Sequence, residues 1–179
     1  MNVPTEATGV QEMDLLVAFF DLTQFTRFSK SRSDRDVVEL LSDYYEFTGD
    51  VIEGSGGKVV SFMGDAGLVV FPEAEVNPGV RALKELKDVG DAWLEDRKAP
   101  CRHVIKAHFG PVCCAWVGTR TDKRFDVFSN TVNTAAVLKS SGLAITPQVF
   151  RKLEPDTRKL FKKHTPPITY IPVEESHKD

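Results

Sequence analysis

The chain is organised around one stretch, Leu15-Leu16-Val17-Ala18-Phe19-Phe20-Asp21-Leu22-Thr23-Gln24-Phe25-Thr26. Six apolar residues run directly into a carboxylate, and a turn of small and polar residues and then a helix follow it. A short apolar run of this length is typical of a strand buried on both faces. Asp21 then lies where the backbone leaves the sheet. It is either a cap for the following helix or one half of a site with a second carboxylate.

The composition is that of one soluble globular domain. The 179 residues carry a net charge of −3, with 41% hydrophobic and 27% charged residues, so no basic field attracts nucleic acid or an anionic membrane. We expect residues 1–13 to form a flexible N-terminal arm and residues 14–179 a single domain. Neither a signal peptide nor an apolar run of about 20 residues is present. Three cysteines without metal-ligand spacing favour a reduced, cytoplasmic protein.

Hydrophobic periodicity predicts an α+β fold with the element order β-α-α-β-β-α-β. This order matches a ferredoxin-like core, in which helices pack on one face of an antiparallel sheet, with an appended hairpin and helix. The first strand is central in this plan. Strands are expected at Leu15–Phe20, Lys58–Ser61, Leu68–Phe71, Arg102–Phe109, Val112–Val117 and Ile168–Val173, with a turn at Gly110-Pro111 and a polar loop from Thr119 to Arg124; helices are expected at Thr23–Lys30, Ser33–Glu53, Asn77–Leu94, Asn130–Leu138 and Pro147–Leu153.

A second carboxylate comes from the link between the two strands that follow the long helix. Gly64 and Asp65 stand in this link, and in a ferredoxin-like sheet the turn falls next to the end of the first strand. Asp65 alone is also compatible with an ordinary hairpin turn. Two carboxylates on neighbouring strand ends form a site for hard divalent cations, which also take phosphate oxygens.

Four segments, in the right order, resemble the catalytic domain of class III nucleotide cyclases and together cover residues 14–142. Phe20–Thr26 is similar to the family's F-x-D-[IL]-x-x-F-T opening, Lys58–Phe71 to its second metal hairpin, His108–Gly118 to its H-x-G-x-[VA]…G hairpin, and Phe125–Ala136 to its D-[IV]-x-G-x-x-V-N-x-A segment.

The resemblance implies a reaction and residues that perform it. Class III cyclases attack the α-phosphorus of a nucleoside triphosphate with the ribose 3′-hydroxyl and release pyrophosphate. By correspondence with the family's motifs, Asp21, Leu22 and Asp65 hold two Mg²⁺ or Mn²⁺ ions per active site, and Asn133 positions the ribose and the transition state. Family enzymes are dimers in which the metal residues of one copy face the remaining residues of the other, so a homodimer with two shared sites is expected.

The substrate contacts follow by the same correspondence. Thr23, Gln24 and Phe25 lie in the turn whose backbone N–H groups suit a triphosphate. Ser61 and Asp126 fall at the two positions that read the base. Adenylate cyclases usually have lysine at the Ser61 position and guanylate cyclases have glutamate, so serine matches neither.

The cationic positions depart from the family's pattern. Val104 replaces a phosphate-binding arginine, with Arg102 and Lys106 on the same strand face by period-two alternation, so Lys106 is the expected contact. A C-terminal lysine that meets the triphosphate corresponds to Lys162 or Lys163.

Val137 stands where the family has its transition-state arginine, four residues after the asparagine. Lys139, Arg124 and Lys123 are the candidate replacements.

The expected function is a nucleotide cyclase that favours UTP over CTP. Asp126 can accept a hydrogen bond from adenine N6, cytosine N4 or uracil N3–H, and Ser61 argues against ordinary purine reading. A catalytic domain without a sensor or membrane part resembles the stand-alone pyrimidine cyclases of bacterial antiphage systems, whose cyclic UMP or cyclic CMP acts on a separate effector protein. The alternatives are a small bacterial adenylate cyclase and, because of Val137, a catalytically degenerate nucleotide-binding or dimerisation module.

Overall fold

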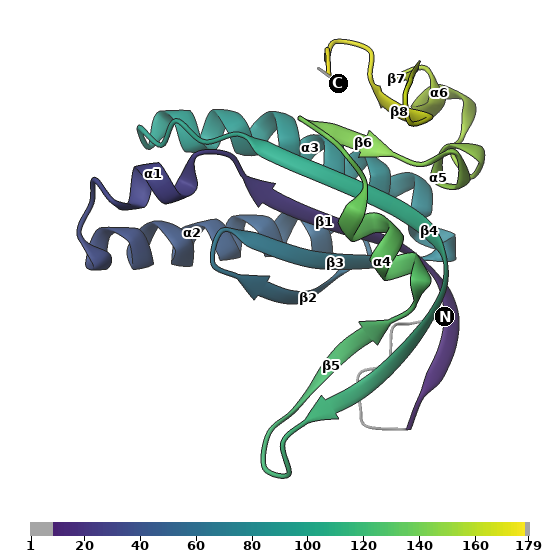
Figure 1. Cartoon of the computed structure of the whole chain (residues 1–179), viewed down its shortest axis with the longest axis horizontal. Coiled ribbons are helices and arrows are strands. Elements are labelled where there is room, and N and C mark those ends of the chain that lie inside the picture. Colours follow the sequence, from purple (N-terminus) through teal and green to yellow (C-terminus); the bar gives the residue numbers. More distant parts are fainter. Residues whose placement is uncertain (1–8, 178–179) are drawn as a thin grey trace.

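Strand β1, Gln11–Leu22, is central in an eight-stranded sheet in the computed structural model, which describes residues 9–177 (Figure 1). Seven strands follow the order β2-β3-β1-β4-β6-β8-β7, and β5 pairs with β4 outside this path. Because β3 and β4 flank β1, residues Leu15–Ala18 are fully buried, as the sequence predicts. The other elements are α1 (Phe25–Ser29), α2 (Asp34–Glu53), β2 (Lys58–Met63), β3 (Ala66–Pro72), the 3₁₀ turn η1 (Glu73–Glu75), α3 (Val76–Asp96), β4 (His103–Gly118), β5 (Lys123–Phe128), α4 (Asn130–Val137), β6 (Leu143–Ile145), α5 (Pro147–Arg151), α6 (Pro155–Arg158), β7 (Phe161–His164) and β8 (Thr169–Pro172).

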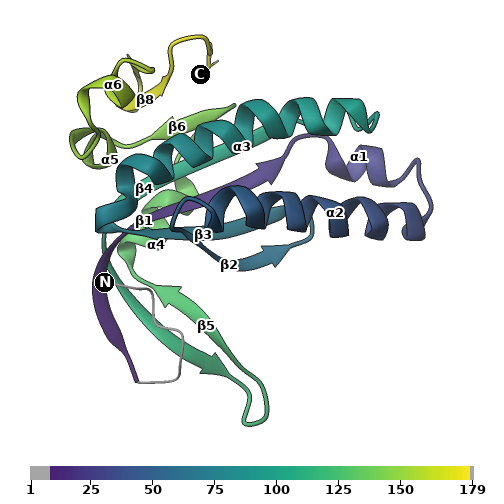
Figure 2. The ribbon, with the colours of Figure 1, turned by 180° about the vertical axis from the view of Figure 1, so that it is seen from behind.

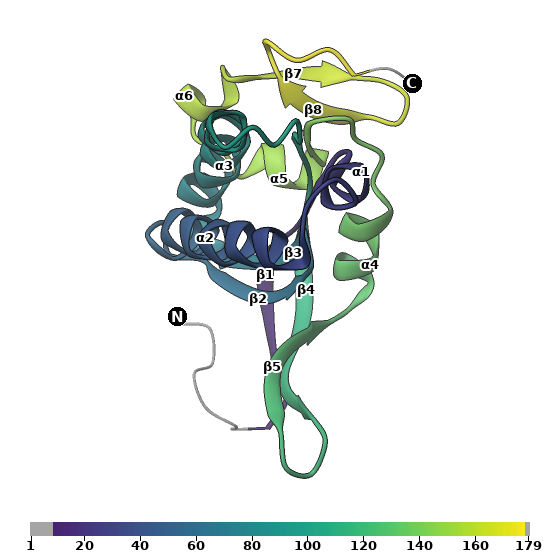
Figure 3. The ribbon, with the colours of Figure 1, turned by 90° about the vertical axis from the view of Figure 1, so that its left-hand side faces the viewer.

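The two faces of β1 are covered by different elements, because successive side chains point to opposite faces. Leu16 and Phe20 pack in the core that α2 and α3 cover, and these two helices lie side by side on that face (Figure 2). Leu15 and Val17 pack in a second cluster with β5 and with Ala135 of α4. The predicted α+β class is confirmed, and α4 adds a helix on the opposite side of the sheet from α2 and α3 (Figure 3).

The expected turn at Gly110-Pro111 is wrong, because β4 is one continuous strand of 16 residues. Pro111 pairs with Asp14 on β1, while on the other edge of β4 the pairing with β6 ends at Ala107 and the pairing with β5 begins at Cys113. Proline lacks an N–H, so it is tolerated where one strand edge has no partner. The hairpin partner of β4 is therefore β5, and the two strands extend together from the body of the molecule (Figure 1).

Three further boundaries differ from the sequence expectation. Residues 11–13, expected in the N-terminal arm, belong to β1, because Gln11 already pairs with Cys114 of β4; residues 1–8 of the expected arm lie outside the described residues. The polar loop ends at Asp122, since β5 begins at Lys123. The predicted final strand is β8, but β7 forms the sheet edge beside it.

No helix among residues 9–177 combines the length and apolar character needed to cross a bilayer. All three cysteines are free: Cys101 lies just before β4, and Cys113 and Cys114 lie on it.

Gly67 is a position where the sheet requires a glycine. A Cβ at this residue would overlap the ring of Phe20 on the neighbouring strand. We expect Gly67→Ala to lower the unfolding free energy by about 2 kcal/mol, because overpacking a core forces side chains from their rotamers. Denaturant unfolding measures this change.

Gly49→Ala is the matched control, because a Cβ there meets nothing within 4 Å on helix α2. Alanine in the middle of a helix should leave the stability unchanged or raise it by up to about 1 kcal/mol. Equal stability of the two variants would contradict the close approach of Phe20 to residue 67.

Candidate functional site

The turn after β1 presents Asp21 at the end of the central strand. Its Oδ1 accepts a hydrogen bond of 2.8 Å from the backbone N–H of Leu22. Thr23 ties the turn to the start of β4, because its N–H donates to the Arg102 carbonyl at 2.9 Å and its Oγ1 accepts from the Arg102 N–H at 3.1 Å. Gln24, at φ 60°, is the residue that begins α1. The helix-cap alternative for Asp21 is therefore wrong.

The β2–β3 hairpin brings Asp65 to the same place. Its two-residue turn has Gly64 at φ 63°, the left-handed conformation that tight hairpins require and that glycine adopts without strain. The hydroxyl of Tyr45 on α2 donates to the Gly64 carbonyl at 2.7 Å, and the Tyr45 ring stacks on Phe62 with ring centroids 3.8 Å apart. The turn is thus held from the helix as well as by its own strands.

Asp21 and Asp65 line one pocket of about 530 Å³. Burial and the adjacent Asp21 carboxyl raise the pKa of Asp65 to about 6. Burial is the larger cause, and the Asp21 carboxyl adds to the shift because a like-charged neighbour disfavours ionisation. The full lining is Asp21, Leu22, Gln24, Phe25, Thr26, Arg27, Lys30 and Asp65.

The residues present fit a magnesium-type site. Two carboxylates converge, and residues 9–177 contain no cluster of three or more histidine, cysteine or acidic side chains suited to a metal ion. Mg²⁺ is commonly bound by one or two carboxylates together with water and substrate phosphates, rather than by a full protein cage. Asp21 and Asp65, with the backbone of Leu22, are the groups that would hold such ions. Phe25 contributes only backbone here, because its side chain is 8% exposed.

The other predicted site residues lie on different elements and outside this pocket. Ser61 is on β2, Asp126 on β5 and Asn133 on α4. Ser61 pairs with Leu68, so it faces the same side of the sheet as the second core cluster. The Asn133 side chain is exposed, and Asp126 Oδ1 accepts from the Val127 N–H at 2.8 Å.

Helix α4 lies beside the middle of β1. Ala135 is in the same hydrophobic cluster as Val17, and the Thr131 hydroxyl donates to the Pro111 carbonyl at 2.8 Å. Asn133 is not among the residues that line the pocket of Asp21 and Asp65.

Comparisons with known proteins decide the family. The description "Adenylate and Guanylate cyclase catalytic domain" belongs to the family profile that matches residues 10–165. The chain belongs to this cyclase family. Retinal guanylyl cyclase 1 of Bos taurus is 33% identical over 152 residues, which are 80% of this chain and 13% of that protein. The cyclase domain thus spans about an eighth of the length of this relative.

Solved cyclase structures have the same fold. The adenylyl cyclase CyaB from P. aeruginosa aligns with a TM-score of 0.80 at 16% identity, covering 94% of this chain and 97% of that chain. A dimeric guanylyl cyclase domain from Blastocladiella emersonii aligns with a TM-score of 0.69 at 21% identity, covering 96% and 99%. The family and fold expected from the four motifs are confirmed.

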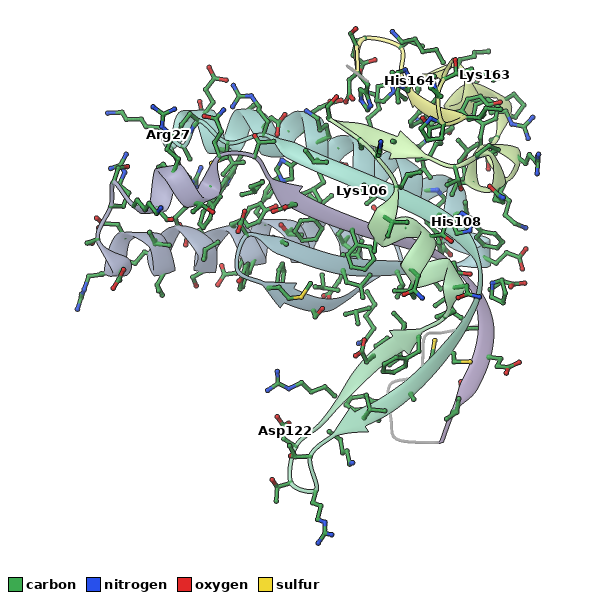
Figure 4. All side chains as sticks on the ribbon, in the orientation of Figure 1. Arg27, Lys106, His108, Asp122, Lys163 and His164 are labelled. Carbon is green, nitrogen blue, oxygen red and sulfur yellow. The ribbon has the colours of Figure 1, made fainter. Side chains whose placement is uncertain are left out.

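The cationic side chains expected to bind phosphate instead contact carbonyl or carboxylate groups of their own chain. Lys106 Nζ donates to the Ala136 carbonyl at 3.2 Å, and Arg102 pairs with Glu95 at 3.0 Å. Arg102 lies just before β4 rather than on it. Lys162 Nζ donates to the Val173 carbonyl at 2.9 Å. Its neighbour Lys163 is exposed on β7, on the opposite side of the molecule from α1 (Figure 4).

Val137 is 78% exposed and lines a pocket of about 500 Å³ between α4 and the β7–β8 turn. Of its candidate replacements, Arg124 pairs with Asp122 at 2.9 Å and Lys123 donates to the Gly118 carbonyl at 3.1 Å. Lys139 lines the Val137 pocket, and its ammonium makes no hydrogen bond or ion pair within residues 9–177.

The sequence did not indicate Arg27 and Lys30, which line the pocket, or Tyr45, which holds the hairpin turn. Tyr45 is part of the helical periodicity of α2, which gives no sign of its bond to Gly64. Arg27 on α1 and Lys30, the C-cap of α1, are three residues apart, and only this spacing after Asp21 could have indicated a shared face.

The raised pKa of Asp65 predicts a pH-dependent stability. In metal-free protein the folded state holds this proton up to about pH 6, whereas the ordinary pKa of an aspartic acid is 3.8. Asp65 therefore contributes stability that is complete below pH 3.8 and is lost as the pH rises through 6. Because the carboxyl is partly exposed, solvent screening limits the loss to about 1 kcal/mol. We expect wild type to lose this amount relative to Asp65→Asn between about pH 4 and pH 7 in a chelator.

Added Mg²⁺ or Mn²⁺ should restore the stability of wild type at neutral pH and leave Asp65→Asn unchanged. Asp43→Asn, at an exposed carboxylate of α2, is the control and should behave as wild type. Chemical unfolding at each pH measures the difference. A pH profile shared by wild type and Asp65→Asn would contradict the convergence of the two carboxylates.

Proposed function

We propose that the chain is a nucleotide cyclase that converts a nucleoside triphosphate into a 3′,5′-cyclic nucleotide and pyrophosphate. The observation that carries this proposal is the convergence of Asp21 and Asp65 in one pocket at the end of β1. Within residues 9–177 neither carboxylate forms a salt bridge, and placing one carboxyl beside another in a partly buried site is unfavourable. A bound cation would offset this repulsion.

Each residue of the pocket has a part in the proposed reaction. Asp21 and Asp65 would hold two divalent cations, which when bound lower the pKa of the attacking hydroxyl and stabilise charge on the leaving phosphate. The N–H groups of Leu22 and Thr23 already donate to Asp21 Oδ1 and to the Arg102 carbonyl, so the phosphate chain binds to the backbone N–H groups of Gln24 and Phe25 in the same turn. Tyr45 fixes the hairpin, so that Asp65 does not move away from Asp21 when the site is empty.

The complete site in this proposal is shared by two copies of the chain. Asn133 is exposed on α4 and does not line the pocket that contains the two carboxylates of its own chain. In a twofold dimer, α4 of one copy faces the pocket of the other, and two equivalent sites form. Asn133 then positions the ribose, and Ser61 and Asp126 read the base.

A pyrimidine, UTP ahead of CTP, is the proposed substrate. Serine at position 61 offers neither the cation nor the anion that purine-specific relatives place there, and Asp126 accepts from uracil N3–H or cytosine N4. We assign the product to bacterial antiphage signalling through a separate effector protein in the cytoplasm. ATP is the alternative substrate, because the fold neighbour from P. aeruginosa is an adenylyl cyclase.

A catalytically inactive nucleotide-binding or dimerisation module is the second candidate. Val137 favours it, because an exposed apolar side chain beside Pro166 and Pro167 offers nothing to a developing phosphate charge. The two functions differ in turnover, so one assay separates them.

The assay incubates the purified chain with Mn²⁺ and, separately, ATP, GTP, CTP and UTP, and detects cyclic products by mass spectrometry. We expect cyclic UMP as the main product, and loss of at least about a hundredfold in rate for Asp21→Ala or Asp65→Ala. Faster turnover of ATP than of either pyrimidine would exclude the pyrimidine assignment. No cyclic product from any nucleotide would exclude the enzyme.

Mixing two inactive variants tests the shared site. A dimer of Asp21→Ala with Asn133→Ala contains one site with both native residues and one with neither. Random mixing should therefore restore about a quarter of the wild-type activity. Mixed Asp21→Ala and Asp65→Ala chains are the control and should stay inactive, because no site in them has both carboxylates. If the first mixture is also inactive while both variants are folded and dimeric, each chain contains its own site.

A further inference from the structure

Two cations that no family motif assigns, Arg27 and Lys30, line the same pocket as Asp21 and Asp65. Within residues 9–177, neither side chain makes a hydrogen bond or an ion pair. An arginine and a lysine that face a pocket without partners are available to an anion.

The anchoring of α1 explains why these side chains face the pocket. Phe25 and Phe28 are both 8% exposed, with ring centroids 6.1 Å apart, and fix one side of the short helix to the core. Arg27 and Lys30 stand three residues apart and so share the other side. Figure 4 shows Arg27 on α1, at the end of the molecule where β1 ends.

The cations that the family's motifs suggested as phosphate contacts at β4 and β7 differ in this respect. Lys106, Arg102 and Lys162 each donate to a carbonyl or a carboxylate of their own chain. The guanidinium of Arg32, two residues after Lys30, lies over the Phe28 ring at 5.2 Å and is not part of the pocket. The free positive charge near the two carboxylates thus comes from α1.

The balance of charges indicates which anion the pocket can bind. A nucleoside triphosphate carries about four negative charges and the two carboxylates add two, while two divalent cations supply four positive charges. About two negative charges therefore remain, and Arg27 and Lys30 together supply two positive charges. A pyrophosphate chain leaves a similar excess of negative charge.

We propose that Arg27 and Lys30 form an oligophosphate subsite that binds the β- and γ-phosphates of the substrate, and the pyrophosphate product, in the same copy of the chain that holds the metal ions. The inference rests on the proposed function for its substrate class. Arg27 binds two phosphate oxygens through its planar guanidinium, and Lys30 acts as a point charge. These cations take the place of the absent charges at Val104 and Val137 by stabilising the leaving pyrophosphate from the metal side.

Calorimetric titration of Mg²⁺-pyrophosphate into the full chain tests the subsite without turnover. We expect Arg27→Gln and Lys30→Gln each to weaken binding about tenfold, because each removes a charge-assisted contact, and the double variant to weaken it further. Titration of Mg²⁺ alone should be unchanged in these variants. Arg32→Gln is the matched control, since it removes the same charge from the same segment outside the pocket.

Two results would overturn the subsite. One is an affinity for Mg²⁺-pyrophosphate in both single variants equal to that of the wild type. The other is an equal loss of binding in Arg32→Gln, which would show a general field effect. Circular dichroism and thermal unfolding check that all variants remain folded.

The subsite and the proposed function fail separately. If the four nucleotides give no cyclic product but the two variants lose pyrophosphate affinity, the subsite stands and the chain is a binding module. If cyclic product forms and both variants keep the wild-type pyrophosphate affinity and the wild-type KM for the triphosphate, the enzyme stands and the subsite is wrong.

Discussion

Two carboxylates held side by side repel each other unless a proton or a cation lies between them. The fold imposes this position on Asp21 and Asp65, the first at the end of the central strand and the second in the adjoining hairpin turn. The raised pKa of Asp65 is the cost of that arrangement in the metal-free chain. The pocket lining, the left-handed Gly64 and the bond from Tyr45 all serve to keep the pair together.

The arrangement of the remaining polar residues follows from the sheet. Alternation along β1 assigns one face to α2 and α3 and leaves the other to α4 and β5. The pocket of Asp21 and Asp65 lies at one end of this strand, and α4 lies beside the middle of the strand. A single chain therefore presents two separated sets of functional side chains, and a twofold axis is the simplest operation that joins them.

The sequence was sufficient where the signal is local. The apolar run before Asp21 predicts the central strand, and Gly64-Asp65 predicts the hairpin turn, because each depends on a few adjacent residues. It was insufficient at Gly110-Pro111, where a turn and a continuous strand look alike. A proline fits in a strand only where no neighbouring strand needs its backbone N–H. The neighbours on that edge of β4 are β5 and β6, which the local sequence around Pro111 does not identify. Tyr45, Arg27 and Lys30 were missed for the same reason, since their contacts or pocket are formed by the tertiary fold. The site assignments taken from motifs, such as Asn133 and Asp126, remain predictions.

The hydrogen bond from Tyr45 to the Gly64 carbonyl ties helix α2 to the hairpin turn that carries Asp65. Twenty residues of helix span about 30 Å, and its fully buried side chains, beginning at Tyr44, lie in the second half. Tyr45, next to this buried part, bonds to the Gly64 carbonyl and stacks on Phe62, so the position of Asp65 relative to Asp21 depends on how the second half of α2 is packed in the core.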